Sequence, residues 1–378
     1  MTATLEPPVA DVTEKLVPEA PLRLRRFDQA DIGRLAGAAV AAFCLDWLVY
    51  ERLTPLSGGL GFWVCWYVAF LAIYGFMVRD ARGSVAARDR VAAVVMTTAG
   101  LGLVVPLSFI LGYVVFKGYH ALRFHFLWEN QAEVGPLSKA TAGGAGHAIV
   151  GTLEQVGLAT LICVPLGVLS AFFLNEVGGR LARPLRTVVD AMSAVPSILC
   201  GLFVYAAWII AFHQEFSGFA AALALSVLML PTVTRATEVV LRLVPGGLRE
   251  GALALGGEER RVARMVVLPT ARIGIVTGVI LGIARVVGET APLFFTAFGS
   301  NSMNWNPFSG PQSSLTLFTW TYIRSSQAAD IARAWTAAFV LTVLVLILFV
   351  IARIIGGRRI GEIGFLRRVI QNRRSASE

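Results

Sequence analysis

The chain has 378 residues, of which 56% are hydrophobic and only 15% are charged. A soluble globular domain carries roughly 25% charged residues, so this composition excludes an ordinary soluble protein and indicates an integral membrane protein. The net charge is +9, with only three lysines, at Lys15, Lys117 and Lys139. The arginine excess lies between apolar runs and at the C-terminus, which points to membrane topology and anionic lipid rather than to nucleic acid.

No sequence pattern predicts a metal or nucleotide site. The four cysteines lie inside apolar runs without C-x-x-C spacing, and the four histidines are scattered. The G-x-x-x-x-G-K-[ST] pattern of a P-loop is absent, so we expect no ATP site of that kind on this chain. We therefore predict neither a metal nor a cofactor.

Residues 1–34 are expected to form a disordered, then basic, cytoplasmic N-terminus. The first part is polar, acidic and proline-bearing, and it has no apolar core of a signal peptide. Residues 357–378 hold six arginines and form the matching basic tail.

Eight apolar runs approach or exceed the length of about 20 residues that a membrane-spanning helix needs. Helices are expected because lipid cannot satisfy a bare backbone. The first run is the shortest and contains Asp46. The eight predicted spans are Leu35–Tyr50, Leu60–Val78, Val91–Phe116, Ala148–Leu174, Val188–Phe212, Phe219–Leu241, Ile275–Phe298 and Trp335–Gly356.

Arginine-rich and arginine-poor connections alternate along the chain. Arginines gather in residues 79–90, 178–187 and 244–274 and in the tail after Gly356. The positive-inside rule places these segments and both termini in the cytoplasm. Eight spans satisfy the rule, and so do six spans with a looped-in pair. The aromatic outer loops, 117–147 and 299–334, are expected to receive a binding protein or to anchor at the membrane surface.

The stretch from Val244 to Pro269 carries a dense arginine cluster in a polar interruption. Residues 250–255 are good helix formers, Gly256 and Gly257 break the pattern, and the following residues resume it. We expect Pro269 to stop this second helix. The pattern predicts a helix–turn–helix on the cytoplasmic face, suited to contact with a partner protein.

This stretch resembles the EAA loop of ABC importer permeases. That loop reads E-A-A, three residues, Gly, nine residues, an aliphatic residue, one more residue and L-P. Gly251 stands where the pattern has Ala, at a cost of roughly 1 kcal/mol of helix stability. The resemblance implies that the loop docks on a separate ATPase subunit. The matching positions are Glu250, Gly251, Ala252, Gly256, Val266, Leu268 and Pro269.

Four ionisable residues inside the predicted spans are candidates for function, because charges are costly in a membrane. Arg235 and Glu238 are three residues apart, and Arg285 and Glu289 are four apart, so each pair is expected on one helix face. The guanidinium fork suits an oxyanion such as phosphate. Glu289 is expected to pair with Arg285 when substrate is absent. From the charges alone, structural ion pairs that lock the helices are equally consistent.

The runs GETAPL (288–293) and VPSI to GLFVY (195–205) resemble the phosphate ABC transporter permease family, PstA type, as does the run from Gly146 to Glu176. The resemblance covers roughly residues 91–355. It implies an all-α integral membrane protein with the type I six-helix permease core at residues 91–356. Residues 35–90 would add two N-terminal transmembrane helices to that core.

The resemblance further implies that Arg235, Arg285 and Glu289 line the substrate path, with Glu238 beside them. It implies a PstC-type permease, two copies of a PstB-type ATPase and an extracytoplasmic PstS-type phosphate-binding protein as partners. The chain itself would be a transport subunit of the bacterial inner membrane and not an enzyme.

Four alternatives remain open at this point. The chain could carry another oxyanion, such as sulfate or molybdate, or it could be the PstC-type sister subunit. A proton-coupled secondary transporter would use Arg235 and Glu289 directly and would have no need of an EAA loop. A membrane scaffold would have no reason to bury arginines.

Overall fold

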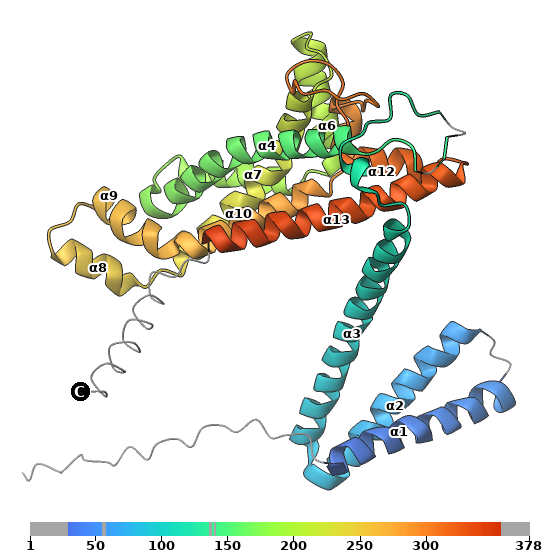
Figure 1. Ribbon diagram of the computed structural model, residues 1–378. Coiled ribbons are helices and arrows are strands. Elements are labelled where there is room, and N and C mark those ends of the chain that lie inside the picture. The colour runs from blue at the N-terminus through green and yellow to red at the C-terminus, as the bar shows by residue number, and fades with distance from the viewer. Residues whose placement is uncertain (1–28, 55–57, 136–137, 140, 357–378) are drawn as a thin grey trace, which may run out of the picture. The chain divides into compact units, whose positions relative to one another are not determined.

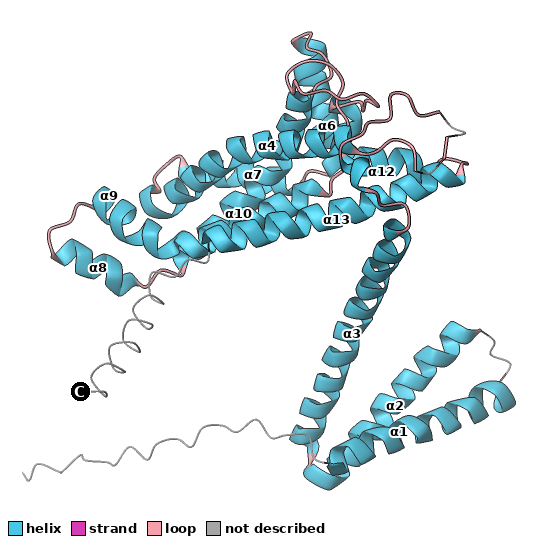
Figure 2. Cartoon of the chain, viewed as in Figure 1, coloured by secondary structure: helices cyan, strands magenta, loops and turns pink. Residues whose placement is uncertain are grey.

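The structure, a computed structural model, describes residues 29–54, 58–135, 138–139 and 141–356. The predicted tails therefore lie largely outside the described residues. The described part is helical apart from turns and one isolated parallel bridge between Phe298 and Gln312, as Figure 2 shows. The prediction of an all-α membrane protein is confirmed.

Short turns join most of the α-helices, and longer segments join α3 to α4 and α11 to α12. They are α1 (Gln29–Leu48), α2 (Gly59–Arg82), α3 (Ser84–Tyr119), α4 (Gly146–Phe172), α5 (Ala182–Ala194), α6 (Ser197–Val204), α7 (Gly218–Arg242), α8 (Gly246–Ala254), α9 (Glu259–Val262), α10 (Leu268–Val287), α11 (Ala291–Thr296), α12 (Leu315–Ile323) and α13 (Ala328–Gly356). A 3₁₀ turn forms η2 (Phe124–Leu127), and π-helical turns form η1 (Val49–Leu53), η3 (Phe173–Val177), η4 (Tyr205–Ala211) and η5 (Ala263–Val267).

Six helical segments of the described chain are long and apolar enough to cross a membrane. They are Gly59–Arg82, Ser84–Tyr119, Gly146–Val177, Gly218–Arg242, Glu259–Val287 and Ala328–Ile351. The helix α1 has the length of a span but carries Asp31, Arg34 and Asp46 within its 20 residues, and it falls outside this set. The first predicted span, Leu35–Tyr50, has the shortest apolar run, and the composition of α1 does not support it as a membrane-spanning helix.

Two predicted spans are interrupted. The run Val188–Phe212 forms α5 and then α6 with η4, which meet at a bend of 108°. Pro196 sits at this break, where it cannot donate a backbone hydrogen bond and biases Val195 toward an extended conformation. The run Ile275–Phe298 forms α10 only as far as Val287, and α11 is a separate helix.

The helices fall into two compact units, residues 1–108 and 109–378. In the first unit, α1, α2 and the start of α3 pack around Ala38, Phe70, Tyr74 and Val78. A buried carboxylate, Asp31, binds the guanidinium groups of three arginines, which ties the three helices together. Those arginines are Arg34, Arg82 and Arg90.

In the second unit, α4, α7, α10 and α13 run side by side (Figure 1). Three glycines of α10 at four-residue spacing allow its close approach to α7. A Cβ atom on Gly274 would lie 2.4 Å from Val240, and one on Gly278 would lie 2.7 Å from Ala236. Small residues are the usual means of such packing between membrane helices. The helices α8 and α9 lie at one end of this layer, and α6 and α12 lie at the other (Figure 1).

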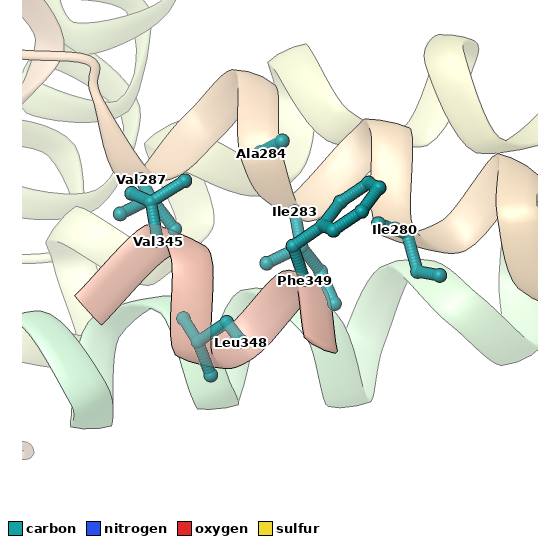
Figure 3. Close-up of a pocket in the computed structure, with 7 residues that line it drawn as sticks. All are labelled: Ile280, Ile283, Ala284, Val287, Val345, Leu348 and Phe349. Carbon is teal, nitrogen blue, oxygen red and sulfur yellow. The ribbon is translucent and has the colours of Figure 1, made fainter. Parts of the chain in front are cut away.

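The seam between α10 and α13 is tightly packed. Figure 3 shows a recess of about 10 Å³ there, which is no larger than the space needed for one water molecule. Every residue around it is apolar, so the seam holds the two helices together and offers no ligand site. Its lining is Ile280, Ile283, Ala284, Val287, Val345, Leu348 and Phe349.

Candidate coupling loop and substrate path

The predicted helix–turn–helix is present at the end of the layer that carries α8 and α9. The helix α8 contains Glu250, Gly251 and Ala252, and Gly256 makes the turn with a φ of 82°. Only glycine adopts this backbone conformation without a steric penalty. The following residue, Gly257, lies so close to α8 that a Cβ atom would come within 2.9 Å of the Ala252 carbonyl oxygen. The two glycines therefore fix the angle between α8 and α9.

The expected stop at Pro269 is wrong. The segment Glu259–Val287 runs as one long helical span through α9, the π-helical turn η5 and α10, with Leu268 and Pro269 in the first turn of α10. Pro269 is tolerated because it directly follows the π-helical turn η5, where the hydrogen-bonding pattern of the helix changes. The coupling loop is thus the direct extension of a membrane-spanning helix.

One ion pair fixes α8 to the rest of the unit. Arg249 donates to the Glu176 carboxylate at 2.7 Å and to the Leu241 carbonyl oxygen at 3.0 Å. Glu176 lies in η3 after α4, and Leu241 lies near the end of α7. These contacts join α8 to the ends of α4 and α7, and the turn at Gly256 joins α8 to the helical segment that continues into α10.

The outer surface of the coupling loop is both apolar and charged. Glu250 is exposed, and Leu255 at the turn is 90% exposed. Leu248 and Leu253 of α8 and Met265 of η5 are exposed as well. A short helix that shows leucines to solvent beside a charged residue is typical of a surface that a partner covers.

Glu238 is the centre of a cluster of charges between α5 and α7. Its side chain is 3% exposed and accepts from Arg186 of α5 at 2.7 Å and from Arg235 of α7 at 2.8 Å. Arg242, one turn further along α7, also binds it. The prediction that Arg235 and Glu238 share one helix face is confirmed, and the two form an ion pair. Glu238 binds three arginines, however, and not Arg235 alone.

Asp190 completes this cluster from α5 and binds the other side of the Arg235 guanidinium. Its side chain is 55% exposed and that of Arg235 is 36% exposed. The Arg235 guanidinium therefore lies between the buried carboxylate of Glu238 and the exposed carboxylate of Asp190. The cluster, named here the Glu238 cluster, comprises Arg186, Asp190, Arg235, Glu238 and Arg242.

Arg285 lies on α10 in a different setting. Its guanidinium donates to the Thr232 hydroxyl of α7 at 3.4 Å, and within the described residues no carboxylate forms an ion pair with it. Thr232 precedes Arg235 by one turn of α7, about 4.5 Å along the helix. Arg285 is exposed in the isolated chain. Within the described residues, most N–H donors of this guanidinium therefore remain available to bind another group.

The expected pairing of Arg285 with Glu289 on one helix face is wrong. The helix α10 ends at Val287, and Gly288 and Glu289 form the break before α11. Glu289 is anchored through its backbone, since its N–H donates to Val286 and its carbonyl accepts from Thr316 of α12 at 3.1 Å. The four-residue spacing applies only inside a continuous helix.

The two motifs that are most specific in the sequence contact each other. Gly201 of α6 faces α11 so closely that a Cβ atom would lie 2.5 Å from the Pro292 Cα atom. Leu293 and Cys200 are buried in the same apolar cluster. The helices that follow the two breaks, α6 and α11, therefore pack against each other. In a membrane protein, broken helices are tolerated where the protein buries them or where they line a water-filled cavity.

Sequence reasoning did not assign roles to Arg186, Arg242 and Glu176. Arg186 was counted only as a loop charge that sets topology, Glu176 only marked the end of a motif, and Arg242 follows a predicted span and was not considered. The partners of Arg186 and Glu176 are 52 and 73 residues away in the chain, whereas Arg242 is four residues from Glu238. The signal that could have found them is charge placement at the ends of predicted spans, but it does not identify which ends meet.

Comparison with known proteins identifies the family. Residues 163–361 match the family described as the binding-protein-dependent transport system inner membrane component. The chain belongs to this family. It is accordingly a transport subunit and a multi-pass protein of the bacterial inner membrane, in agreement with its apolar helices.

Several curated relatives are similar over most of their length. The phosphate transport system permease protein PstA 1 of Mycobacterium tuberculosis (strain CDC 1551 / Oshkosh) is 40% identical over 259 residues, which cover 68% of this chain and 85% of the relative. PstA of Haemophilus influenzae is 38% identical over 66% of this chain and 86% of its own. PstA of Yersinia pestis is 35% identical over 72% and 91%.

Solved structures resemble the chain only distantly. A bacterial ABC transporter involved in the import of the acidic polysaccharide alginate has a TM-score of 0.48 and 15% identity, covering 71% of this chain and 95% of its own. The family assignment rests on the sequence matches.

Proposed function

We propose that the chain is the PstA-type permease subunit of an ATP-driven phosphate importer. The observation that carries the proposal is the 40% identity to a phosphate transport permease over 85% of that protein's length. The contact between the GETAPL and VPSI–GLFVY motifs adds support, because those motifs are the ones that resemble the PstA type. No observation favours another oxyanion, the PstC-type sister or a proton-coupled transporter.

The partners follow from this proposal. A PstC-type permease would complete the translocation path, two PstB-type ATPases would hydrolyse ATP, and a PstS-type protein would deliver phosphate from outside. Both termini would be cytoplasmic. The coupling loop, with Glu250, Gly251, Ala252 and Gly256, would dock on one ATPase. The exposed leucines of α8 and the exposed Glu250 are the surface that this docking would bury.

Motion would pass from the ATPase to the path through two connections. One is the continuous helix from α9 into α10, which carries Arg285 near its far end. The other is the Arg249–Glu176 ion pair, which links α8 to the end of α4. In this mechanism a displacement of α8 moves Arg285 relative to the break at Gly288.

Within the path, Arg285 would make the first contact with phosphate, because its guanidinium fork fits two phosphate oxygens and, among the described residues, is bound only to a hydroxyl. Arg235 would be the second contact, and phosphate would compete there with Asp190. Glu238 would hold Arg235 in place from behind. Glu289, at the break, would limit how tightly the anion is bound.

The experiment is uptake of labelled phosphate in cells that lack their own PstA-type permease and carry this chain with its partner genes. The proposal predicts uptake that unlabelled phosphate suppresses and that sulfate and molybdate leave unchanged. It also predicts loss of uptake when the ATPase partner is inactivated. Uptake that persists without the ATPase would favour the secondary transporter, and suppression by sulfate would favour another oxyanion.

A further inference from the structure

The first unit contains a groove that the proposed transport function does not use. It lies between α2 and the first part of α3 and has a volume of about 920 Å³. All of its lining residues fall between positions 72 and 96, so it belongs to the first unit alone. Both helices are candidate membrane spans, so the groove opens toward lipid.

Small side chains make the groove hollow. Ala72 and Gly75 of α2 and Ala87 and Ala92 of α3 line it, with Phe76 among them. A Cβ atom on Gly75 would lie 3.2 Å from Val91 of α3, so the helices are closest there. Further along, the Tyr67 and Thr98 hydroxyls are hydrogen-bonded across the two helices.

The groove is polar at one end and apolar over the rest of its length. Arg79 and Arg88 line the end next to the α2–α3 turn at Gly83, and Val95 and Met96 line the opposite end. Met96 is eight residues beyond Arg88, which corresponds to roughly 12 Å along a helix. One leaflet of the hydrocarbon core is about 15 Å deep. The apolar part thus extends over most of the depth of one leaflet.

Within the described residues, the two arginines at the polar end form no ion pair. The other basic residues of this corner, Arg34, Arg82 and Arg90, are gathered on Asp31. No carboxylate in the described part of the chain forms an ion pair with Arg79 or Arg88.

Two carboxylates do lie near these arginines in the sequence. Asp80 and Asp89 each follow an arginine by one position, which turns them about 100° around the helix, and neither lines the groove. The polar end of the groove therefore presents two exposed positive charges at the depth where headgroups lie.

We propose that this groove binds an anionic phospholipid of the membrane, with its phosphate on Arg79 and Arg88 and one acyl chain along Phe76, Val95 and Met96. Basic pockets between membrane helices recognise anionic headgroups in this way. The positive-inside rule assigns the polar end to the cytoplasmic leaflet. The bound lipid would hold α2 and α3 together at the turn.

The test measures binding of a spin-labelled phosphatidylglycerol to the full chain, co-expressed with its partner subunits and purified in neutral detergent. Unlabelled phosphatidylglycerol should compete, whereas phosphatidylcholine and inorganic phosphate should not. The double variant Arg79→Gln/Arg88→Gln should weaken binding roughly 25-fold, because each arginine near an anionic surface contributes about fivefold. The matched control Arg180→Gln/Arg183→Gln removes two exposed arginines outside the groove and should change binding less than twofold.

A second variant tests the apolar part independently. Ala92 is exposed and lines the groove, so Ala92→Trp should obstruct its apolar part without disturbing the core and should weaken lipid binding at least tenfold. Unchanged binding in either groove variant overturns the proposal. Equal competition by inorganic phosphate also overturns the proposal, since the acyl chain would then contribute nothing to binding. A crosslink between residue 92 and another protein segment, together with no lipid binding, would show that protein and not lipid occupies the groove, and would overturn the proposal as well.

Discussion

Arg235 of α7 and Arg285 of α10 are close in the fold, because Arg285 donates to Thr232, three residues before Arg235 on α7, yet their surroundings differ. Arg235 is held between two carboxylates, one of them buried, and belongs to a cluster that joins α5 to α7. Among the described residues, Arg285 has only a hydroxyl as a hydrogen-bond partner, at 3.4 Å, and it lies next to a helix break. A guanidinium that is already paired stabilises the fold, whereas one with free donors can bind an anion. Under the proposed function, Arg235 would therefore act chiefly in structure and Arg285 chiefly in substrate binding.

The largest expected effect comes from Arg285→Gln. The variant should reduce phosphate uptake at least 100-fold, because it removes the charged fork without creating an unpaired partner. Uptake of labelled phosphate measures this, with assembly of the complex checked by co-purification. Arg272→Gln, an exposed arginine of the same helix, is the matched control and should transport normally. Normal transport by Arg285→Gln would place this arginine outside the path.

The next effect is on stability. Glu238→Gln leaves three guanidinium groups around a neutral amide and should lower the free energy of unfolding by about 2 kcal/mol, less than a fully buried pair because the arginines are partly exposed. Thermal unfolding in detergent measures it. Asp190→Asn, whose side chain is 55% exposed, should cost much less. Equal losses in the two variants would show that Glu238 is not the centre of the cluster.

A pH-dependent effect is expected in the first unit. Burial raises the pKa of Asp31, but Arg82, Arg90 and Arg34 outweigh burial and hold the pKa below its usual value of 3.8. A carboxyl group whose pKa is lower in the folded state stabilises the fold above its unfolded-state pKa and loses this contribution as the pH falls through the folded value. Protection of α1 and α2 against hydrogen exchange, corrected for the intrinsic exchange rate at each pH, should therefore fall below about pH 4. Asp31→Asn should remove this step, and a step that survives would assign it to another group.

The smallest effect concerns the departure from the EAA pattern. Gly251 lies in α8, is exposed and has open space where a Cβ atom would stand. Gly251→Ala should therefore stabilise α8 by up to about 1 kcal/mol and leave uptake unchanged. Gly256→Ala is the contrasting control, because its φ of 82° strains any other residue. Slower hydrogen exchange of α8 measures the first change, and faster exchange there would contradict it.

Sequence patterns predicted the fold class and the coupling loop because both depend on local composition and spacing. The glycines at 256 and 257 make the turn where the pattern placed it. Hydropathy did not find the bend near Pro196 or the end of α10 at Val287, because an apolar run has the same composition whether it is straight or broken. The Arg285–Glu289 prediction failed for this reason.

Partners distant in the sequence were also beyond prediction. Glu238 and Arg235 are close in sequence and were paired correctly, but Arg186 reaches Glu238 from another helix. The positive-inside rule alone can explain an arginine near the end of a span, so the sequence does not reveal which residue that arginine contacts. The division of roles between the two arginines is visible only once their neighbours are placed.

The most direct test of this division compares the KM for phosphate uptake in Arg285→Lys and Arg235→Lys. Lysine keeps the charge but loses the two-pronged geometry, so the variants separate anion recognition from charge balance. The account predicts that Arg285→Lys raises the KM at least tenfold with little change in the melting temperature. Arg235→Lys should lower the melting temperature and raise the KM less. A larger rise in KM for Arg235→Lys, or an unchanged KM for Arg285→Lys, would contradict the account.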